Sequence, residues 1–221
     1  MTAAHVLVAD LSVPTLAPDD AHHLASALRL RPGEEVGATD GRGGYVPCAY
    51  SGPGQLEPTG PVVVAPARSP RLMVGFVPVK GDRPEWVVQK LTELGVDEIV
   101  LLSSARSVVR WEGAKAASHI ERLARVARSA LMQSRGVWLP DLSGVAPYSS
   151  ISGSAVAQMG GGPVGPEVHS ILVGPEGGWD AVELSTAGTV VGLGDGVLRA
   201  ETAAVAAGVL MTALRAGTVA A

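Results

Sequence analysis

The sequence predicts an α/β protein in which a small β-barrel or sandwich precedes a larger α/β domain. Short apolar stretches broken by glycine and proline fill residues 1–68, a spacing typical of small all-β domains. From residue 71 the pattern alternates strand, helix and strand, which is typical of a largely parallel sheet. A chain of 221 residues is long enough to bury a core in each of the two domains. We therefore expect domains at 1–68 and 71–221, joined at "APARSP".

The first domain takes its strands from "AHVLVAD", "EEVGATDGRGGYVPCAYS" and "PVVVAP". Between the first two, "PDDAHHLASALRLRPGEEV" begins as a helix, with Asp19 or Asp20 as its N-terminal cap. Pro32 and Gly33 end this segment in a turn.

The second domain opens with a βαβ unit. "RLMVGFVPV" and "VDEIVLLSS" are its strands, and the helix between them has Asp82 as its cap and Gly95 as its stop. A long helix follows from Ala114 to Ser134. The next segment, "GSAVAQMGGGPVGPEVH", is rich in glycine, and we expect a mobile connection there.

Two strand–loop–helix units close the chain. The first runs from "SILV" through "GPEGG" to "WDAVELSTAG", and the second from "TVVGLG" through "DGVL" to "RAETAAVAAGVLMTALRAG". In an open α/β sheet, ligands bind beyond the carboxyl ends of the strands, where both glycine loops lie. Glycines there let a ligand approach the backbone closely, although two ordinary tight turns would show the same residues.

Composition excludes several classes of protein. A single cysteine, Cys48, rules out an internal disulfide and a cysteine-based zinc site, and the five histidines show no metal-ligand spacing. No apolar run approaches the roughly 20 residues that cross a bilayer, and the N-terminus lacks the features of a signal peptide. We expect a metal-free, cytoplasmic protein with no membrane partner.

Charge is distributed unevenly along the chain. The net charge is −4, yet residues 105–135 carry seven basic and two acidic side chains. Within the long helix Arg122, Arg125 and Arg128 recur every three residues and are expected to be exposed together. This basic segment is either a phosphate-binding surface or a solvated helix face.

The residues around the glycine loops argue against a nucleotide phosphate. Glu176 and Asp180 flank the first loop, Asp195 and Glu201 flank the second, and no Walker-type Gly-Lys-Ser/Thr occurs. Carboxylates repel a triphosphate but tolerate a ligand with a positive charge, such as the sulfonium of S-adenosylmethionine.

At this point the residues resemble a known family. "ILVGPEGGW", followed by "VGLGDGVLRAETAA", is similar to the cofactor-binding signature of the SPOUT methyltransferases, and specifically of the RsmE family, which methylates N3 of a uridine in 16S ribosomal RNA. "HHLASALRLRPGEEV", "EWVVQKLTELGVDEIV" and "ARSVVRW" resemble other motifs of that family, in the same order. The resemblance covers residues 22–204. It implies a PUA-like RNA-binding β-barrel, a SPOUT domain with a trefoil knot, and a homodimer that acts on the small ribosomal subunit.

The resemblance also implies which residues hold S-adenosylmethionine. They are Leu172, Gly174, Glu176, Gly177, Gly178, Leu193, Gly194, Leu198 and Thr202. One departure lies in the long helix, where the family shows Ala-x-Glu-Gln-Ser followed by Gly-Arg and this chain reads "ALMQSRG". Met132 replaces the acid, and Arg135 comes one place early.

Two residues are candidates for catalysis. Uridine N3 carries a proton, so the site must remove it or stabilise the charge that spreads to O2 and O4. We expect Arg199 to stabilise that charge, or else to form a salt bridge with Asp195 or Glu201. Glu201 is a candidate general base, or it favours the start of a helix.

A third set is expected to contact RNA, because arginines grip phosphates and stack on unpaired bases. It comprises His22, Arg29, Arg31, Arg106, Arg110 and Arg135. His22 has an alternative as a buried capping or packing residue, and Trp86 and Trp138 are expected in the core.

Three functions follow from these residues. The first is an S-adenosylmethionine-dependent RNA methyltransferase. The second is a non-catalytic RNA-binding or ribosome-assembly protein of the same fold, against which the intact glycine loops argue. The third is a nucleotide-dependent enzyme, which the acidic loops disfavour.

Overall fold

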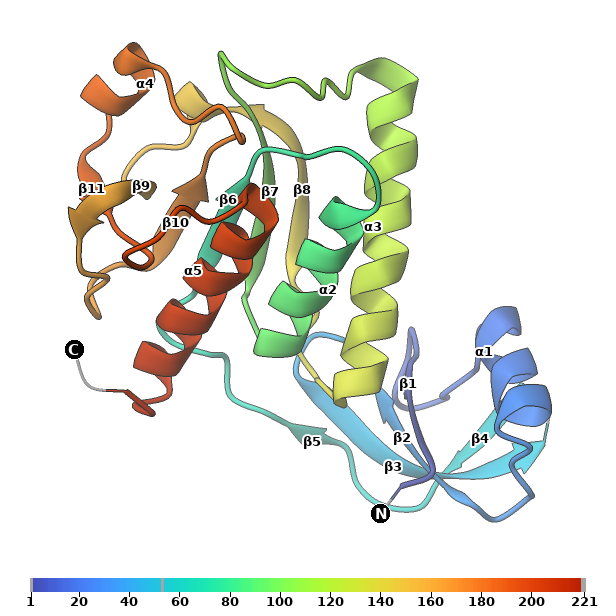
Figure 1. Cartoon of the computed structure of the whole chain (residues 1–221). Coiled ribbons are helices and arrows are strands. Elements are labelled where there is room, and N and C mark those ends of the chain that lie inside the picture. The colour runs from blue at the N-terminus through green and yellow to red at the C-terminus, as the bar shows by residue number, and fades with distance from the viewer. Residues whose placement is uncertain (1, 53, 220–221) are drawn as a thin grey trace. The chain divides into compact units, whose positions relative to one another are not determined.

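The computed structural model of the protein describes residues 2–52 and 54–219, which form two compact units (Figure 1). The first unit comprises the chain up to Ala67 together with Arg128–Leu139. The second comprises Arg68–Ala127 and the chain from Pro140 onwards. The division within the long helix has no counterpart in the sequence pattern.

The first unit is built on a five-stranded sheet in the order β1-β2-β3-β4, with β5 paired to β3. The pair β1–β2 is parallel and the other pairs are antiparallel. Alternate residues of β3 point into the core, as expected for a half-buried strand. The strands are β1 (Ala4–Leu7), β2 (Glu35–Thr39), β3 (Gly44–Gly52), β4 (Gln55–Pro58) and β5 (Val63–Val64).

The helical segment of the first unit is short. Helix α1 (Pro18–His22) passes into a single π-helical stretch, η1 (His23–Ala27), and Leu24 is the residue that it buries. Neither Asp19 nor Asp20 is the N-cap, because Ala17 occupies that position and makes no side-chain cap. Asp20 instead forms an ion pair with Arg128.

The segment after the long helix completes the first unit. Gly43 N–H donates to the carbonyl of Val137 at 2.7 Å, and the ring of Trp138 packs so closely on Gly43 that a Cβ there would lie 2.3 Å from it. His5 Nε2 donates to the carbonyl of Gly136 at 3.0 Å. Contacts between residues far apart in sequence therefore place this segment against the N-terminal strands.

The second unit is a six-stranded sheet in the order β11-β9-β10-β6-β7-β8, and every pairing in it is parallel. The expectation of a largely parallel sheet is confirmed. Its carboxyl ends meet at one edge, so the loops that follow the strands share that edge. The strands are β6 (Met73–Phe76), β7 (Glu98–Ser103), β8 (Asp141–Pro147), β9 (Ala155–Gly162), β10 (Ser170–Val173) and β11 (Thr189–Val191).

Strand β9 overturns one expectation. Residues expected to form a mobile connection pair with both β10 and β11, and Ala155 and Val156 are buried. The sequence pattern did not indicate a strand here because the segment ends in three glycines, yet β9 pairs with a strand on each side. Pairing and burial outweigh the weak strand preference of glycine here.

The helices of the second unit begin and end close to the expected residues. Helix α2 (Arg83–Leu94) ends at Gly95, which has the left-handed φ of 80° that glycine favours at this position. Asp82 occupies its N-cap but makes no capping hydrogen bond. The others are α3 (Gly113–Ser134), the 3-10 turn η2 (Tyr148–Ser150), α4 (Ala181–Ser185) and α5 (Ala200–Arg215).

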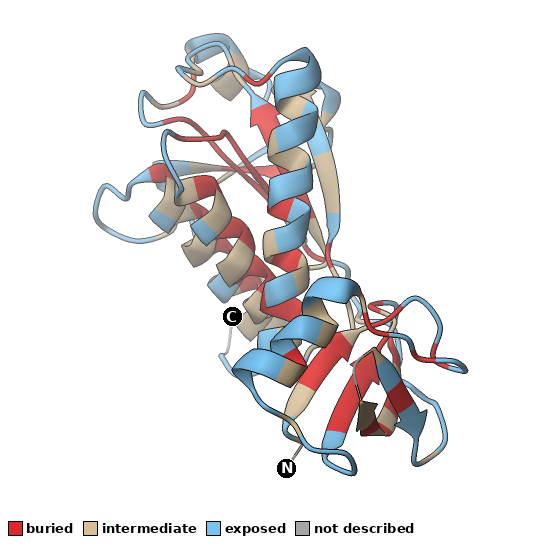
Figure 2. Ribbon diagram, turned by 90° about the vertical axis from the view of Figure 1, so that its right-hand side faces the viewer, coloured by how far each residue is buried: buried red, intermediate tan, exposed pale blue. Residues whose placement is uncertain are grey.

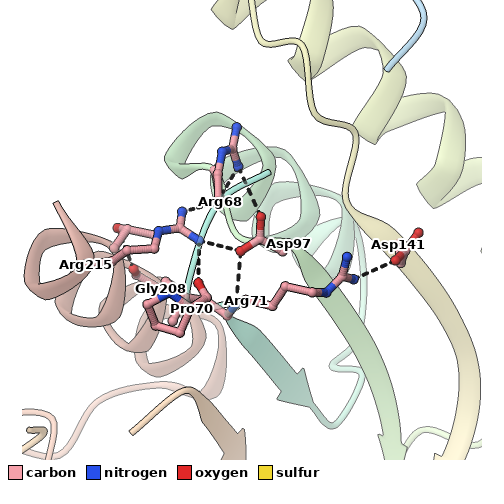
Figure 3. Close-up of polar contacts among 10 residues, drawn as sticks. Arg68, Pro70, Arg71, Asp97, Asp141, Gly208 and Arg215 are labelled. Atoms are coloured by element: carbon pink, nitrogen blue, oxygen red, sulfur yellow. Dashed lines mark hydrogen bonds and ion pairs between the residues drawn. The ribbon is translucent and has the colours of Figure 1, made fainter. Parts of the chain in front are cut away.

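An ion-pair cluster lies at the amino-terminal ends of β6, β7 and β8 (Figure 3). The Asp97 carboxylate accepts the Leu72 N–H at 2.9 Å, lies 3.6 Å from Arg68 Nη1 and pairs with Arg215 at the end of α5. Arg68 and Arg215 also donate to the carbonyl of Gly95, at 2.6 and 2.7 Å. Burial lowers the pKa of Arg68 from its ordinary value, although the charge of Asp97 opposes this.

Candidate active site

A cavity of about 220 Å³ opens at the carboxyl edge of the sheet, where strand β9 meets the loops after β10 and β11. Residues within β9 and the segments that follow β10 and β11 form its walls. The residues that line it are Ala157, Gln158, Met159, Val173, Gly174, Pro175, Glu176, Gly178, Trp179, Leu193, Gly194, Gly196, Val197, Leu198, Ala200 and Ala203.

The loop after β10 forms one wall as a tight turn. Gly178 N–H donates to the carbonyl of Pro175 at 2.8 Å, and Gly178 has a φ of 70°. The indole of Trp179 leaves no space at Gly174, where a Cβ would lie 2.9 Å from the ring. Trp179 Nε1 then donates to the carbonyl of Ala157 at 3.1 Å, so it ties this loop to β9.

The second glycine loop leads into α5. Gly194 has a φ of 145°, which an ordinary side chain rarely allows. Val197 and Leu198 line the cavity with 83% and 37% of their surfaces exposed, and Met159 on β9 is exposed as well. The cavity therefore combines an open backbone with apolar side chains, which suits the uncharged parts of a nucleoside or thioether ligand.

Arg83, in the first turn of α2, contacts both loop regions. Its Nη1 lies 2.8 Å from a carboxylate oxygen of Glu176, and its Nε lies 3.6 Å from Glu201 Oε1. Glu201 is largely buried, with only 13% of its side chain exposed, and its Oε2 has no hydrogen-bond partner. Sequence reasoning did not single out Arg83, because an arginine at the start of a helix is unremarkable without its partners.

This pairing changes the electrostatic argument drawn from the sequence. Glu176 and Glu201 share a cation, so these two carboxylates do not repel a phosphate as bare acidic groups would. What disfavours a triphosphate is instead the make-up of the walls. Neither lysine nor arginine lines the cavity within the described residues, and its exposed side chains are mainly apolar.

The residues expected to hold the cofactor fall into two groups. Gly174, Glu176, Gly178, Leu193, Gly194 and Leu198 line the cavity. Leu172 is buried in the core beneath it, Gly177 accepts a hydrogen bond from Arg106 at 3.1 Å, and Thr202 is exposed on α5. Trp179 and residues 157–159 of β9 were not expected at the cavity, and the tryptophan directly after the glycines was the one available signal.

Arg199 occupies the N-cap of α5 between two residues that line the cavity, Leu198 and Ala200. Its side chain is exposed and makes no ion pair within residues 2–52 and 54–219. The alternative of a salt bridge to Asp195 or Glu201 is therefore not observed. Among the described residues Arg199 thus has no ionic partner, and its backbone lies between two residues of the cavity wall.

The residues expected to contact RNA are divided between the units. Arg106 and Arg110 lie in the second unit, in the loop between β7 and α3. His22, Arg29, Arg31 and Arg135 lie in the first unit and are all exposed. The alternative of a buried His22 is not observed, since its Nδ1 lies 3.4 Å from Ser26 Oγ at the surface.

Arg135 also has a structural role. It follows the end of α3 with a φ of 57°, and its guanidinium donates to the carbonyl of Thr2 at 2.9 Å. Met132, the departure from the family pattern, packs against the core of the first unit. Packing against this core thus explains the apolar residue at position 132.

The basic face of α3 is not continuous. Arg122 pairs with Glu85, and Arg128 pairs with Asp20 and is only 31% exposed, whereas Arg125 is exposed with no partner within the described residues. Figure 2 shows the exposed face of this helix in pale blue and the buried stripe in red. Another expectation is wrong at Trp86, which is 42% exposed instead of in the core.

Residues 2–52 and 54–219 contain neither a metal-binding group nor a membrane-spanning helix. No group of three histidine, cysteine or acidic side chains could hold a metal ion. No described helix is both long enough and apolar enough to cross a bilayer.

Comparisons with known proteins agree with this geometry. The RNA methyltransferase domain family matches residues 67–160 and 165–212, and the RNA methyltransferase PUA domain family matches residues 16–56. A ribosomal RNA small subunit methyltransferase E from Mycobacterium bovis is 31% identical over 215 residues, which cover 86% of this chain and 82% of that protein. The protein of that name from Bacillus subtilis is 26% identical, with 84% of each chain covered.

A solved structure shares the whole fold. It is a ribosomal RNA small subunit methyltransferase E from Neisseria gonorrhoeae bound to S-adenosyl methionine, with a TM-score of 0.81, 26% identity and coverage of 96% of this chain and 97% of that one. The N-terminal unit is thus PUA-like, and the C-terminal unit has the SPOUT methyltransferase fold. On the family match and the similarity to these relatives, the chain belongs to the RsmE family of RNA methyltransferases.

Proposed function

We propose that this protein transfers the methyl group of S-adenosylmethionine to N3 of a uridine in 16S ribosomal RNA of the small subunit. The cavity formed by the two glycine loops carries this proposal, because it lies at the carboxyl edge of a parallel sheet and its walls combine open backbone with apolar side chains. Relatives named as ribosomal RNA methyltransferases are similar to this chain over most of its length.

S-Adenosylmethionine would supply the reactive methyl group, and the chain's own residues would position it. Gly174, Gly178 and Gly194 bring the backbone to the cavity surface, where N–H and C=O groups can bind adenosine. Trp179 closes the wall behind them. These residues provide alignment and exclusion of water, which are the main contributions that a transfer of this kind requires.

Arg199 is the residue proposed to stabilise charge on the target base. Loss of the N3 proton spreads negative charge to O2 and O4 of uracil, and a guanidinium with no ionic partner among the described residues can donate to such an oxygen. Glu201 is less suited to act as a base, because it is largely buried and its Oε1 faces Arg83 at 3.6 Å. The group that accepts the proton is left unassigned.

The proposal also includes the oligomeric state of the protein. We expect a homodimer, supported by the exposed apolar side chains of Met159, Val197 and Leu198 around the cavity. We also expect the trefoil knot of the family and a cytoplasmic location, where the small subunit is assembled. Light scattering during size exclusion over a tenfold range of concentration would test the dimer, and a constant monomer mass would contradict it.

The central test uses small subunits from cells that lack this protein. Purified protein and labelled S-adenosylmethionine should place one methyl group on a uridine of 16S ribosomal RNA, located by mass spectrometry of the digested RNA. Calorimetric titration with S-adenosylmethionine separates this function from a non-catalytic assembly role. Cofactor binding without methyl transfer to naked RNA or to particles would contradict the proposed reaction.

A further inference from the structure

A second cavity, of about 370 Å³, lies in the same unit at the carboxyl ends of β6, β7 and β8. Pro78, just after β6, and Leu102, at the end of β7, form part of its wall. The loop that leads to α3 covers it with Arg110, Trp111 and Glu112. No residue of the first cavity lines this one.

Its size and chemistry are those of a ligand site. Packing voids inside proteins rarely exceed a water molecule, whereas small-ligand sites measure about 300–1,000 Å³. The partly exposed side chains of Val109 and Val145 offer an apolar wall, and Ser103 adds a hydroxyl at its edge. Such a combination is typical of a site for a base or a similar flat ring.

Two charged side chains at this cavity lack partners inside the protein. Arg110 and Glu112 form neither an ion pair nor a side-chain hydrogen bond within the described residues, although both line the cavity. Some arginines of the unit are occupied in ion pairs, for example Arg83 and Arg122. The cavity therefore offers one cation and one acceptor to a ligand.

One loop links this cavity to the first. Ala105 N–H donates to Glu183 at 2.9 Å, and Arg106 Nη1 donates to the carbonyl of Gly177 at 3.1 Å, so the loop that covers the second cavity also touches the first glycine loop. A strand of RNA with its target base at the first cavity would meet this loop next.

We propose that the second cavity binds an unpaired nucleotide of the RNA substrate that neighbours the target uridine. Arg110 would hold a phosphate, the wall at Val109 and Val145 would receive the base, and Glu112 would accept a hydrogen bond from an N–H on its edge. The inference rests on the proposed function, and it adds a site that reads RNA beside the reacting base.

The first test compares two arginines that carry the same charge. Arg110→Ala should raise KM for small-subunit RNA about tenfold and should lower the slope of log affinity against log salt by about 1, while the affinity for S-adenosylmethionine stays the same. Arg125→Ala removes an exposed charge on α3 away from the cavity and should change KM less than twofold. Equal losses in both variants would show general electrostatic attraction and would overturn the proposal.

The second test fills the cavity without altering charge. Ser103→Phe places a ring in the wall and should weaken RNA binding at least fivefold with an unchanged salt slope. Ser185→Phe, at an exposed serine outside the cavity, is the matched control and should bind RNA as the unaltered protein does. Normal RNA affinity in both Arg110→Ala and Ser103→Phe would overturn the proposal.

RNA affinity measured by filter binding does not depend on methyl transfer. A protein that binds RNA through Arg110 and Ser103 but transfers no methyl group would refute the proposed function and leave standing only the binding of RNA at the second cavity. Titration with guanosine and uridine monophosphates tests whether the second cavity binds RNA or a free nucleotide. Micromolar binding of either one that RNA does not displace would overturn the proposal.

Discussion

At the scale of single residues, Arg199 is the residue proposed to stabilise charge on the target base. It caps α5 between two residues of the cavity wall and has no ionic partner within the described residues. A group that stabilises charge only as the base loses its proton affects turnover more than binding.

Arg199→Ala should therefore lower kcat by about 100-fold or more, as loss of one preorganised donor does elsewhere. The affinity for S-adenosylmethionine should stay within a few-fold, because that ligand does not need the guanidinium. Single-turnover methylation and calorimetry measure the two quantities. Unchanged turnover would remove Arg199 from the mechanism.

Arg83 should affect the binding of the cofactor more than the rate of methyl transfer. It holds the side chain of Glu176, at the cavity wall, and that of Glu201 at the start of α5. Arg83→Ala should raise KM for S-adenosylmethionine about tenfold with a smaller change in kcat, because the loop loses its tether while Arg199 stays. Steady-state kinetics check this.

Two controls make the result on Arg83 specific. Arg83→Lys should recover only part of the affinity, since a single ammonium cannot match the two-sided contact of a guanidinium. Arg71→Ala removes an exposed ion pair with Asp141 at the other edge of the sheet and should leave KM unchanged. An Arg83→Ala variant with normal KM would show that the loop needs no tether.

At the scale of elements, His5 joins β1 to the segment after α3. Its imidazole donates to Gly136, and burial lowers its pKa from the ordinary value of 6.5, with Arg135 acting in the same direction. Below pH 6.5 the unfolded chain gains a proton that the folded protein resists. The contribution of His5 to stability is thus complete above pH 6.5 and is lost as the pH falls toward its lower folded pKa.

His5→Gln keeps a donor for the Gly136 carbonyl but removes the titration. The decline in unfolding free energy just below pH 6.5 should be shallower in this variant than in the unaltered protein. Denaturant unfolding at a series of pH values measures it. His23→Gln, at an exposed histidine of the same unit, should keep the full decline; a decline of the same steepness in His5→Gln would contradict the assignment.

Strand β9 shows the limit of local patterns at this scale. "AVAQMGGG" reads as a flexible connection because glycine permits many conformations, but pairing with β10 and β11 selects the extended one. This strand also brings Gln158 and Met159 to the cavity. A long-range pairing thus decided both the element and part of the site.

At the scale of the molecule, Asp97 ties together segments that are far apart in sequence. From the turn after α2 its carboxylate contacts Leu72 and Arg68, before β6, and Arg215 at the end of α5. Asp97→Ala would leave Arg215 without an anion at a site where only 12% of that side chain is exposed. We expect a loss of about 3 kcal/mol in the free energy of unfolding, measured by denaturant titration.

The comparison for Asp97 is Asp141→Ala. Asp141 forms an exposed ion pair with Arg71, and pairs of this kind contribute less than about 1 kcal/mol. Similar losses in the two variants would mean that burial of the Asp97 cluster has no special effect on stability.

The sequence by itself determined the alternation of strands and helices, the parallel sheet, the two glycine loops and the family. These depend on local periodicity, on glycines where backbone must turn or approach a ligand, and on motifs that stand together in the chain. Only the tertiary structure decided that Arg83 bridges Glu176 and Glu201, that residues 128–139 join the N-terminal unit, and that Arg110 and Glu112 face a second cavity. The physical reason is that an ion pair, a packed ring or a cavity depends on distances between residues that the chain separates by tens of positions.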